Sequence, residues 1–144
     1  LELVKVYGTD QGEFDRAIAH IEQAYLYAKD IEDIQELDYQ MGKNCFFNEK
    51  YELAIEYSSR VQDGVFFGEC LFFIARSLEY MNRFHEAVVV YDQIIDIKYK
   101  HALNLAYLHQ GVCLYEIGAI KSAIKILKKQ RENGTVMIQW QITI

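Results

Sequence analysis

Apolar residues recur along this chain with the spacing of one face of an α-helix. Four segments share one pattern of four residues. An aromatic residue or Ile comes first, Ala stands three positions later, and an aliphatic residue directly follows the Ala. The fourth member stands three positions after the aliphatic residue. Residues at i, i+3, i+4 and i+7 lie on one side of a helix, so each segment predicts an amphipathic helix. The segments are Phe14, Ala17, Ile18 and Ile21; Tyr51, Ala54, Ile55 and Ser58; Phe84, Ala87, Val88 and Tyr91; and Ile120, Ala123, Ile124 and Leu127.

A second helical stretch with the same periodicity precedes each of these segments. The stretches are 35–47, 68–81 and 104–117, together with a truncated one at 1–8. Gly or Asn stands between the two helices of each pair, and both residue types tolerate the left-handed conformation in which helices commonly end. The candidate turn residues are Gly12, Asn48, Asn82 and Gly118. The sequence therefore predicts an all-α chain of helix–turn–helix units, repeated three and a half times.

The period of these units is typical of helical repeat proteins. The alanines of the four stripes, at positions 17, 54, 87 and 123, are separated by 37, 33 and 36 residues. The units resemble tetratricopeptide repeats, whose period is about 34 residues. The residues that carry the resemblance are Val4, Gly12, Phe14 and Ala17; Met41, Gly42, Tyr51 and Ala54; Leu71, Ala75, Leu78, Phe84 and Ala87; and Tyr107, Gly111, Gly118 and Ala123. The resemblance extends from residue 1 to about residue 131, without the closing proline of the motif, since the chain contains no proline.

The resemblance implies a right-handed superhelix of stacked helix pairs over residues 1–134, in which the first helix of each pair lines a concave groove. Motif positions 5, 9 and 12 share one face of that helix and are expected to line the groove. These residues, with His109 at the groove edge, are Tyr39, Lys43, Phe46, Phe72, Arg76, Glu79, Leu108, His109, Val112 and Tyr115. Residues 24–37 also resemble the long-helix repeats of bacterial peptide-responsive regulators of the Rap and PlcR types.

The function implied by this resemblance is a scaffold that binds a peptide or protein segment in the groove. The groove aromatics would supply most of the affinity, and Lys43 and Arg76 would orient an acidic or carboxylate group of the partner. In the alternative interpretation, Phe46 and Phe72 pack between helices and the groove is unused. Two other functions stay open: the peptide-sensing domain of a bacterial transcriptional or signalling regulator, and a structural module for oligomerisation.

Composition and charge narrow the range of partners. The chain has 144 residues, 51% of them apolar, and a formal net charge of −6, which suits nucleic-acid phosphates poorly. Residues 1–63 carry fourteen acidic and six basic side chains, whereas residues 64–144 carry seven and nine. A basic cluster near the C-terminus is expected to be a solvated helix face rather than a nucleic-acid site. Its members are Lys121, Lys125, Lys128, Lys129 and Arg131.

The sequence favours a reducing compartment and gives no sign of a membrane segment. The most apolar stretch, 65–75, is too short to cross a bilayer and is interrupted by Glu69. Cys45, Cys70 and Cys113 are odd in number and lack C-x-x-C spacing, which is typical of free buried thiols. We therefore expect a cytoplasmic protein.

Motifs for catalysis and for cofactor binding are missing from the sequence. It contains no nucleophile elbow and no glycine motif for dinucleotides or phosphates. His109 and Cys113 have the i, i+4 spacing of two metal ligands, but two ligands do not make a site. We expect a groove-edge histidine and a buried cysteine, and hence no enzymatic activity, no cofactor and no metal.

Residues 135–144 form an apolar tail whose pattern supports two interpretations. Val136, Ile138, Trp140 and Ile142 alternate with other residues at the period of a strand, although a fifth repeat should also begin here. A further helix, or a cap, is favoured because a lone strand would have no sheet to join. Such a tail is expected to cap the stack, to fill the groove or to pair with a second copy in a homo-oligomer.

Overall fold

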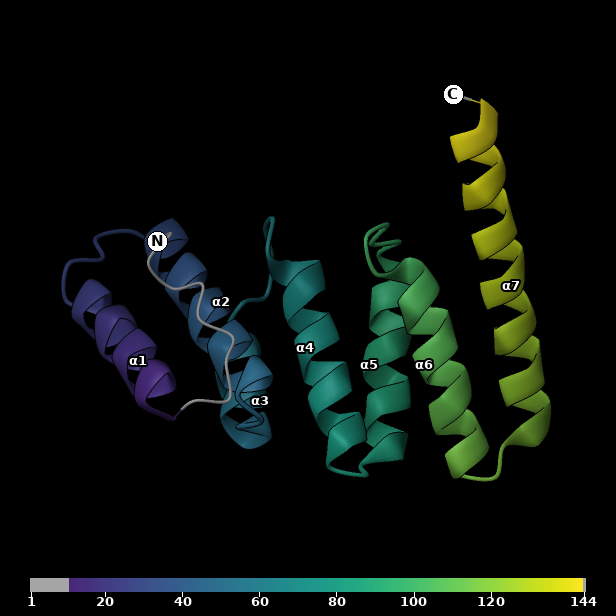
Figure 1. Cartoon of the computed structure of the whole chain (residues 1–144), viewed down its shortest axis with the longest axis horizontal. Coiled ribbons are helices and arrows are strands. Elements are labelled where there is room, and N and C mark those ends of the chain that lie inside the picture. Colours follow the sequence, from purple (N-terminus) through teal and green to yellow (C-terminus); the bar gives the residue numbers. More distant parts are fainter. Residues whose placement is uncertain (1–10, 144) are drawn as a thin grey trace.

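A computed structural model of the chain describes residues 11–143, and for 135–143 it describes the backbone alone. All regular structure in this part of the chain is helical, as the sequence predicts (Figure 1). The helices are α1 (Gln11–Tyr25), α2 (Ile31–Phe47), α3 (Tyr51–Ser58), α4 (Phe67–Tyr80), α5 (Phe84–Asp96), α6 (Leu103–Glu116) and α7 (Ile120–Thr143). The predicted helix at 1–8 lies outside the described residues.

Helices that follow one another in sequence pack side by side. Tight turns join α2 to α3, α4 to α5, and α6 to α7, so the described chain forms three helix–turn–helix pairs preceded by α1 (Figure 1). We call α2, α4 and α6 the first helices and α3, α5 and α7 the second helices. α2 also packs directly against α4, and α6 packs against α5 of the preceding pair.

The turns within the pairs follow the sequence prediction at two of four positions. Asn82 and Gly118 have φ angles of 59° and 84°, in the left-handed region. In the turn after α2 the left-handed residue is Glu49, with φ 62°, rather than Asn48. Asn48 is instead the C-cap residue of α2, and its side chain donates a hydrogen bond from Nδ2 to the Asn44 carbonyl. Gly12 is not a turn residue, because α1 already begins at Gln11.

Small residues allow the helices of a pair to approach closely. The stripe alanines are buried at all four repeat positions, 17, 54, 87 and 123. A Cβ atom on Gly111 would lie 2.5 Å from the Leu127 side chain of α7. A Cβ atom on Gly42 would lie 3.2 Å from the backbone nitrogen of Ser58 in α3. These contacts confirm that both glycines are packing residues, and they explain why the fourth stripe member of that pair is as small as serine.

Among the described side chains, the interior divides into three clusters of buried residues along the row of helices. One joins α1, α2 and α3 around Ile21 and Met41; a second lies between α2 and α4 around Tyr39 and Phe73; the third joins α4, α5 and α6 around Tyr91. Each cluster contains one free, buried cysteine. The cysteines, in the same order, are Cys45, Cys70 and Cys113.

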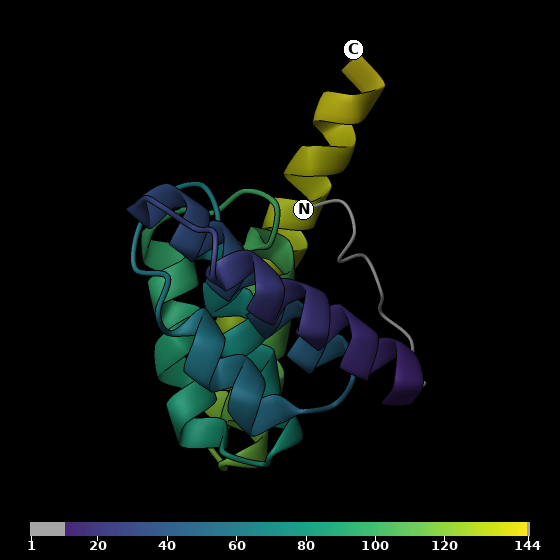
Figure 2. The ribbon, with the colours of Figure 1, turned by 90° about the vertical axis from the view of Figure 1, so that its left-hand side faces the viewer.

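Helix α7 continues without a break through Gly134 to Thr143, so the strand alternative for the tail is wrong over residues 135–143. A single glycine costs a helix only about 1 kcal/mol relative to alanine, which is too little to end it. α7 has 24 residues and its partner α6 has 14, so the C-terminal part of α7 projects beyond the other helices (Figure 2). No described helix is long and apolar enough to span a bilayer.

Candidate functional site

Two of the predicted groove residues lie in the junction between α2 and α4. The Tyr39 side chain is only 5% exposed, and its ring stacks on Phe66 at a centroid distance of 4.4 Å. The Phe46 ring lies 5.3 Å from that of Phe73, which also contacts Tyr39. Tyr39 and Phe46 therefore help to hold two first helices together; Tyr39 is buried and Phe46 is half-buried, and their role as anchors for a partner stays a prediction.

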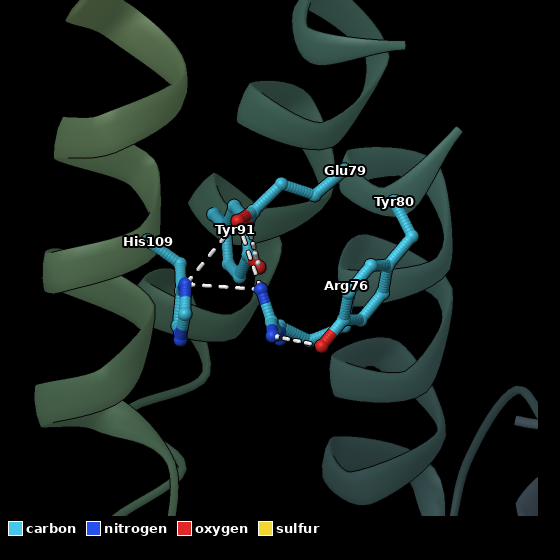
Figure 3. Close-up of polar contacts among 5 residues, drawn as sticks. All are labelled: Arg76, Glu79, Tyr80, Tyr91 and His109. Atoms are coloured by element: carbon cyan, nitrogen blue, oxygen red, sulfur yellow. Dashed lines mark hydrogen bonds and ion pairs between the residues drawn. The ribbon is translucent and has the colours of Figure 1, made fainter. Parts of the chain in front are cut away.

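The predicted groove residues Arg76, Glu79 and His109 meet in one polar network at the junction between α4 and α6 (Figure 3). Arg76 Nη1 donates a hydrogen bond of 2.8 Å to Glu79 Oε2 and lies 3.1 Å from His109 Nδ1. The second carboxylate oxygen, Glu79 Oε1, accepts a 2.8 Å hydrogen bond from the hydroxyl of Tyr91, on α5. His109 Nδ1 also lies 3.4 Å from Glu79 Oε2, so the histidine of α6 contacts both members of the ion pair.

Burial and pairing set the charges of this network. Burial alone would raise the pKa of Glu79, but hydrogen bonds from His109 and Tyr91 and the charge of Arg76 together lower that pKa below its usual value. Glu79 is therefore ionised and compensates the charge of Arg76 within the junction. The Arg76 side chain is 17% exposed. Arg76 is thus already paired within the chain, and its role in orienting an acidic partner stays a prediction.

Phe72 lies in the same junction, where its ring makes an edge contact with His109 at 6.3 Å. This ring is half-buried and packs against the core cluster of α4, α5 and α6. Lys43 of α2 is half-buried, with its Nζ 5.6 Å from the centre of the Tyr39 ring. These positions agree with the alternative in which the predicted groove aromatics of α2 and α4 pack between helices.

The remaining predicted residues lie on α6 and are open to solvent. Leu108, Val112 and Tyr115 are 36%, 40% and 63% exposed. Nine of the ten predicted residues therefore fall into two packed junctions and one open helix face, and the tenth, Lys43, lies beside Tyr39 on α2.

Exposed aromatic side chains lie at the C-terminal ends of the three first helices, and the motif positions missed two of them, Phe47 and Tyr80. Phe47 and Tyr80 are the last residues of α2 and α4, and Tyr115 is the last but one of α6. They are 41%, 52% and 63% exposed. We call these three residues the aromatic edge. Phe47 and Tyr80 each directly follow a motif position, which is Phe46 in α2 and Glu79 in α4. The signal available in the sequence was therefore an aromatic residue next to the last motif position of each helix.

Tyr80 connects the aromatic edge to the polar network. Its hydroxyl accepts a 2.9 Å hydrogen bond from Arg76 Nη2, and the Arg76 guanidinium lies 4.6 Å from the centre of its ring. On its other side the ring stacks on Tyr51 at 4.9 Å, with an interplanar angle of 9°. The exposed Tyr80 ring is therefore fixed in orientation before any partner arrives.

The chemistry of the junction does not suit metal binding or nucleophilic attack. Burial and the nearby Glu79 carboxylate raise the pKa of Cys113 to about 12, so its thiol stays protonated at neutral pH. His109 Nδ1 is engaged by Arg76. Among the described side chains, no three His, Cys, Asp or Glu residues lie close enough together to hold a metal ion.

A separate cavity of about 800 Å³ lies at the start of α2, beside the chain that enters α4. Its walls carry Glu32, Glu36 and Asp63 next to the exposed side chains of Ile31 and Val65. Gln35 donates a 2.8 Å hydrogen bond to Asp63 across it. No predicted site residue lines this cavity.

Comparison with known proteins identifies no relative of this chain. No protein family matches the sequence, and no curated protein is significantly similar to it. The functional argument therefore rests on the geometry of the first helices.

Proposed function

We propose that this chain is a tetratricopeptide-like helical-repeat module that binds a segment of another protein along the aromatic edge of its first helices. The three packed helix pairs, the buried stripe alanines and the close contacts at Gly42 and Gly111 support the repeat assignment. In this proposal the pairs continue the right-handed superhelix of that family, and the chain acts by binding rather than by catalysis.

The aromatic edge is the observation that carries this proposal. Large aromatic side chains are costly to leave in water, and rigid aromatics are the residues that contribute most to protein–protein affinity. Here one such side chain stands at the same end of three successive first helices. Arg76 and Tyr51 hold Tyr80 between them, so its ring would lose little conformational freedom on binding.

The surface of the edge indicates what kind of segment it accepts. Arg76 is neutralised by Glu79, so the edge offers aromatic faces and a phenolic hydroxyl rather than a free charge. We infer an apolar or aromatic-containing segment, in place of the acidic segment that the sequence suggested. Three free buried thiols support the proposal that the chain works in a reducing compartment such as the cytoplasm.

Affinity purification with quantitative mass spectrometry tests this proposal. The bait is the chain with Tyr80→Ser and Tyr115→Ser, and its matched control carries Val89→Ser, which removes a 58% exposed apolar side chain from α5. We expect a partner that the wild type and the control retain and that the double variant loses by tenfold or more. Circular dichroism verifies that all three chains have the same helix content.

Equal recovery of every captured protein by the double variant and the control would reject the aromatic edge as the binding surface. Loss of the same protein from both would show that capture depends on general surface hydrophobicity rather than on this edge.

A further inference from the structure

The cavity at the start of α2 combines acidic and apolar walls. Glu32 and Glu36 stand one turn apart on α2, and Asp63 comes from the chain that enters α4. Ile31 and Val65, beside them, are 71% and 85% exposed. The described lining contains no lysine or arginine, and in the described part of the chain none of the three carboxylates belongs to an ion pair. This acidic cavity therefore offers uncompensated negative charge next to exposed apolar side chains.

The outer face of α7 carries the opposite charge around an apolar side chain. Lys121, Ile124, Lys125 and Lys128 have the spacing of one helix face, whereas Leu127, on the other side of α7, lies against α6. Ile124 is 50% exposed, and the three lysines are exposed as well. Among the described residues, no acidic side chain is paired with any of these lysines. We call these four residues the basic face.

The acidic cavity and the basic face lie at opposite ends of the row of helices. α2 stands beside α1 at one end and α7 stands at the other, with α4, α5 and α6 between them (Figure 1). The two surfaces cannot meet within one chain. A contact between them therefore has to join two copies.

We propose that the basic face of one copy occupies the acidic cavity of a second copy, so that copies associate head to tail. This inference goes beyond the proposed function, because it assigns two other surfaces and a defined partner. The lysines would approach the three carboxylates, and Ile124 would pack against Ile31 and Val65. Because the contact uses two different surfaces, each pair of copies keeps one free cavity and one free basic face, and association continues beyond a dimer.

Charge complementarity favours a second copy as the occupant of the cavity. Residues 1–63 have an acidic excess of eight charges and residues 64–144 a basic excess of two, so unlike ends attract although the whole chain carries −6. Four lysines and only one acid, Glu132, are among the described residues that line the basic face. A head-to-tail contact brings opposite charges together, whereas a contact between like ends would place equal charges against each other.

Lysine is also suited to a cavity with mixed walls. Its aliphatic stem covers apolar surface while its ammonium group stays at a polar edge. The stems of Lys125 and Lys128 can therefore cover Ile31 and Val65 while their charges meet the carboxylates. Since such pairs remain near solvent, the association should weaken as salt is added.

Sedimentation equilibrium over a range of concentrations at low salt tests the association. We expect the mean mass of the wild type to rise with concentration beyond that of a dimer. Two variants each remove one surface: Glu32→Lys with Glu36→Lys reverses the cavity, and Lys125→Glu with Lys128→Glu reverses the basic face. Each variant alone should associate about tenfold or more weakly than the wild type. Circular dichroism verifies that the helix content is unchanged.

A matched control reverses two acidic side chains outside the cavity. Glu52→Lys with Asp96→Lys changes exposed residues of α3 and α5 and alters the net charge as much as the cavity variant does. We expect this control to associate like the wild type. Loss of association in the control as well would show that net charge, rather than the cavity, governs the contact, and would overturn the proposal.

Mixing the two reversal variants gives the decisive result. The cavity variant still has a basic face, and the basic-face variant still has a cavity, so one contact of the wild-type kind remains possible between them. We expect the mixture to form a one-to-one dimer and nothing larger, although each variant alone is monomeric at the same concentration. This recovery also shows that both variants are folded.

A mixture that stays monomeric overturns the proposal, as does a wild type that is monomeric at every concentration or that stops at a two-fold dimer. A monomeric wild type that captures another protein through the cavity would assign the cavity to that protein and overturn the second copy as its occupant. None of these results bears on the aromatic edge, because neither surface contains Phe47, Tyr80 or Tyr115.

Discussion

Helix α4 meets α2 on one side and α6 on the other, and the two junctions differ in chemistry although they use equivalent repeat positions. Between α2 and α4, the ring of Phe73 packs against those of Tyr39 and Phe46, at 6.1 and 5.3 Å. Between α4 and α6, the contact is polar: His109 of α6 lies 3.1 Å from Arg76 and 3.4 Å from Glu79, which form an ion pair of 2.8 Å with each other on α4. The same architecture therefore accepts an apolar junction and a charged one.

The repeat positions in this chain therefore determine where successive first helices contact each other, but not whether the contact is apolar or charged. An aromatic junction gains from the area removed from water, so it should respond little to pH or salt. A buried ion pair replaces the solvation of two charges, and it is stable only while both partners are present and charged. The two junctions should consequently fail under different perturbations, which gives a direct way to separate them.

The largest effect is expected from Phe73→Ala, which removes the central ring of the aromatic junction. Phe73 is 4% exposed and contacts Tyr39 and Phe46, so the substitution leaves a cavity between α2 and α4. We expect the free energy of unfolding to fall by about 3–5 kcal/mol, measured by urea denaturation. The loss should be the same in low and high salt. A loss below about 1 kcal/mol would mean that the junction repacks and that the aromatic contacts are not its main support.

A smaller effect is expected from Glu79→Gln at pH 7. Glutamine keeps the shape of the side chain and can still accept from the Tyr91 hydroxyl, but it leaves the Arg76 charge without its counterion. We expect a loss of about 1–3 kcal/mol in the free energy of unfolding, the range for hydrogen bonds to charged groups. Stability equal to that of the wild type would show that the charged junction contributes specificity of pairing rather than stability.

Acid should remove the difference between the wild type and Glu79→Gln. The pKa of Glu79 in the folded chain is below its ordinary value of 4.5, so its contribution to stability is complete above that value. The contribution is lost as the pH falls through the folded pKa, because Glu79 then becomes neutral like the glutamine. Unfolding curves at a series of pH values should therefore converge for these two chains, while Phe73→Ala keeps its deficit. A gap that persists in acid would contradict the ionised state of Glu79.

The smallest effect is expected from His109→Phe. Phenylalanine preserves the ring packing on Tyr91 at 6.1 Å and on Phe72, and it removes the ring nitrogen that contacts Arg76 and Glu79. Arg76 keeps its bonds to Glu79 and Tyr80, so we expect a loss below about 1 kcal/mol by urea denaturation. A loss as large as that of Glu79→Gln would place the histidine, rather than the carboxylate, at the centre of the junction.

Most helices could be predicted because the apolar spacing is local information. The stretches expected at 35–47, 68–81 and 104–117 correspond to α2, α4 and α6 with shifts of a few residues. The end of α7 could not be predicted in the same way, because Asn133 and Gly134 are typical helix-ending residues and yet α7 continues past both. Whether a chain turns at such a residue depends on what the next segment can pack against, which a local pattern does not contain.

The site was harder to predict than the helices. Repeat positions identified the face of each first helix, but they could not say whether a neighbour covers it; Tyr39 and Leu108 hold the same position, and only Leu108 is exposed. The pairing of Arg76 with His109 joins residues 33 apart, and it depends on how α4 and α6 are oriented. Tyr91 was predicted as a stripe residue from its spacing alone, and its hydrogen bond to Glu79 required the three-dimensional arrangement.

The three free cysteines can report local unfolding of the chain without any added label site. Cys45, Cys70 and Cys113 each lie in a different core cluster, and all three are fully buried. A thiol reagent reaches a buried sulfur only when the surrounding helices separate transiently, at a rate set by the free energy of that opening. Mass spectrometry of the labelled, otherwise unmodified chain would thus give the labelling rate of each cysteine separately. These rates would show which of the three core clusters opens first.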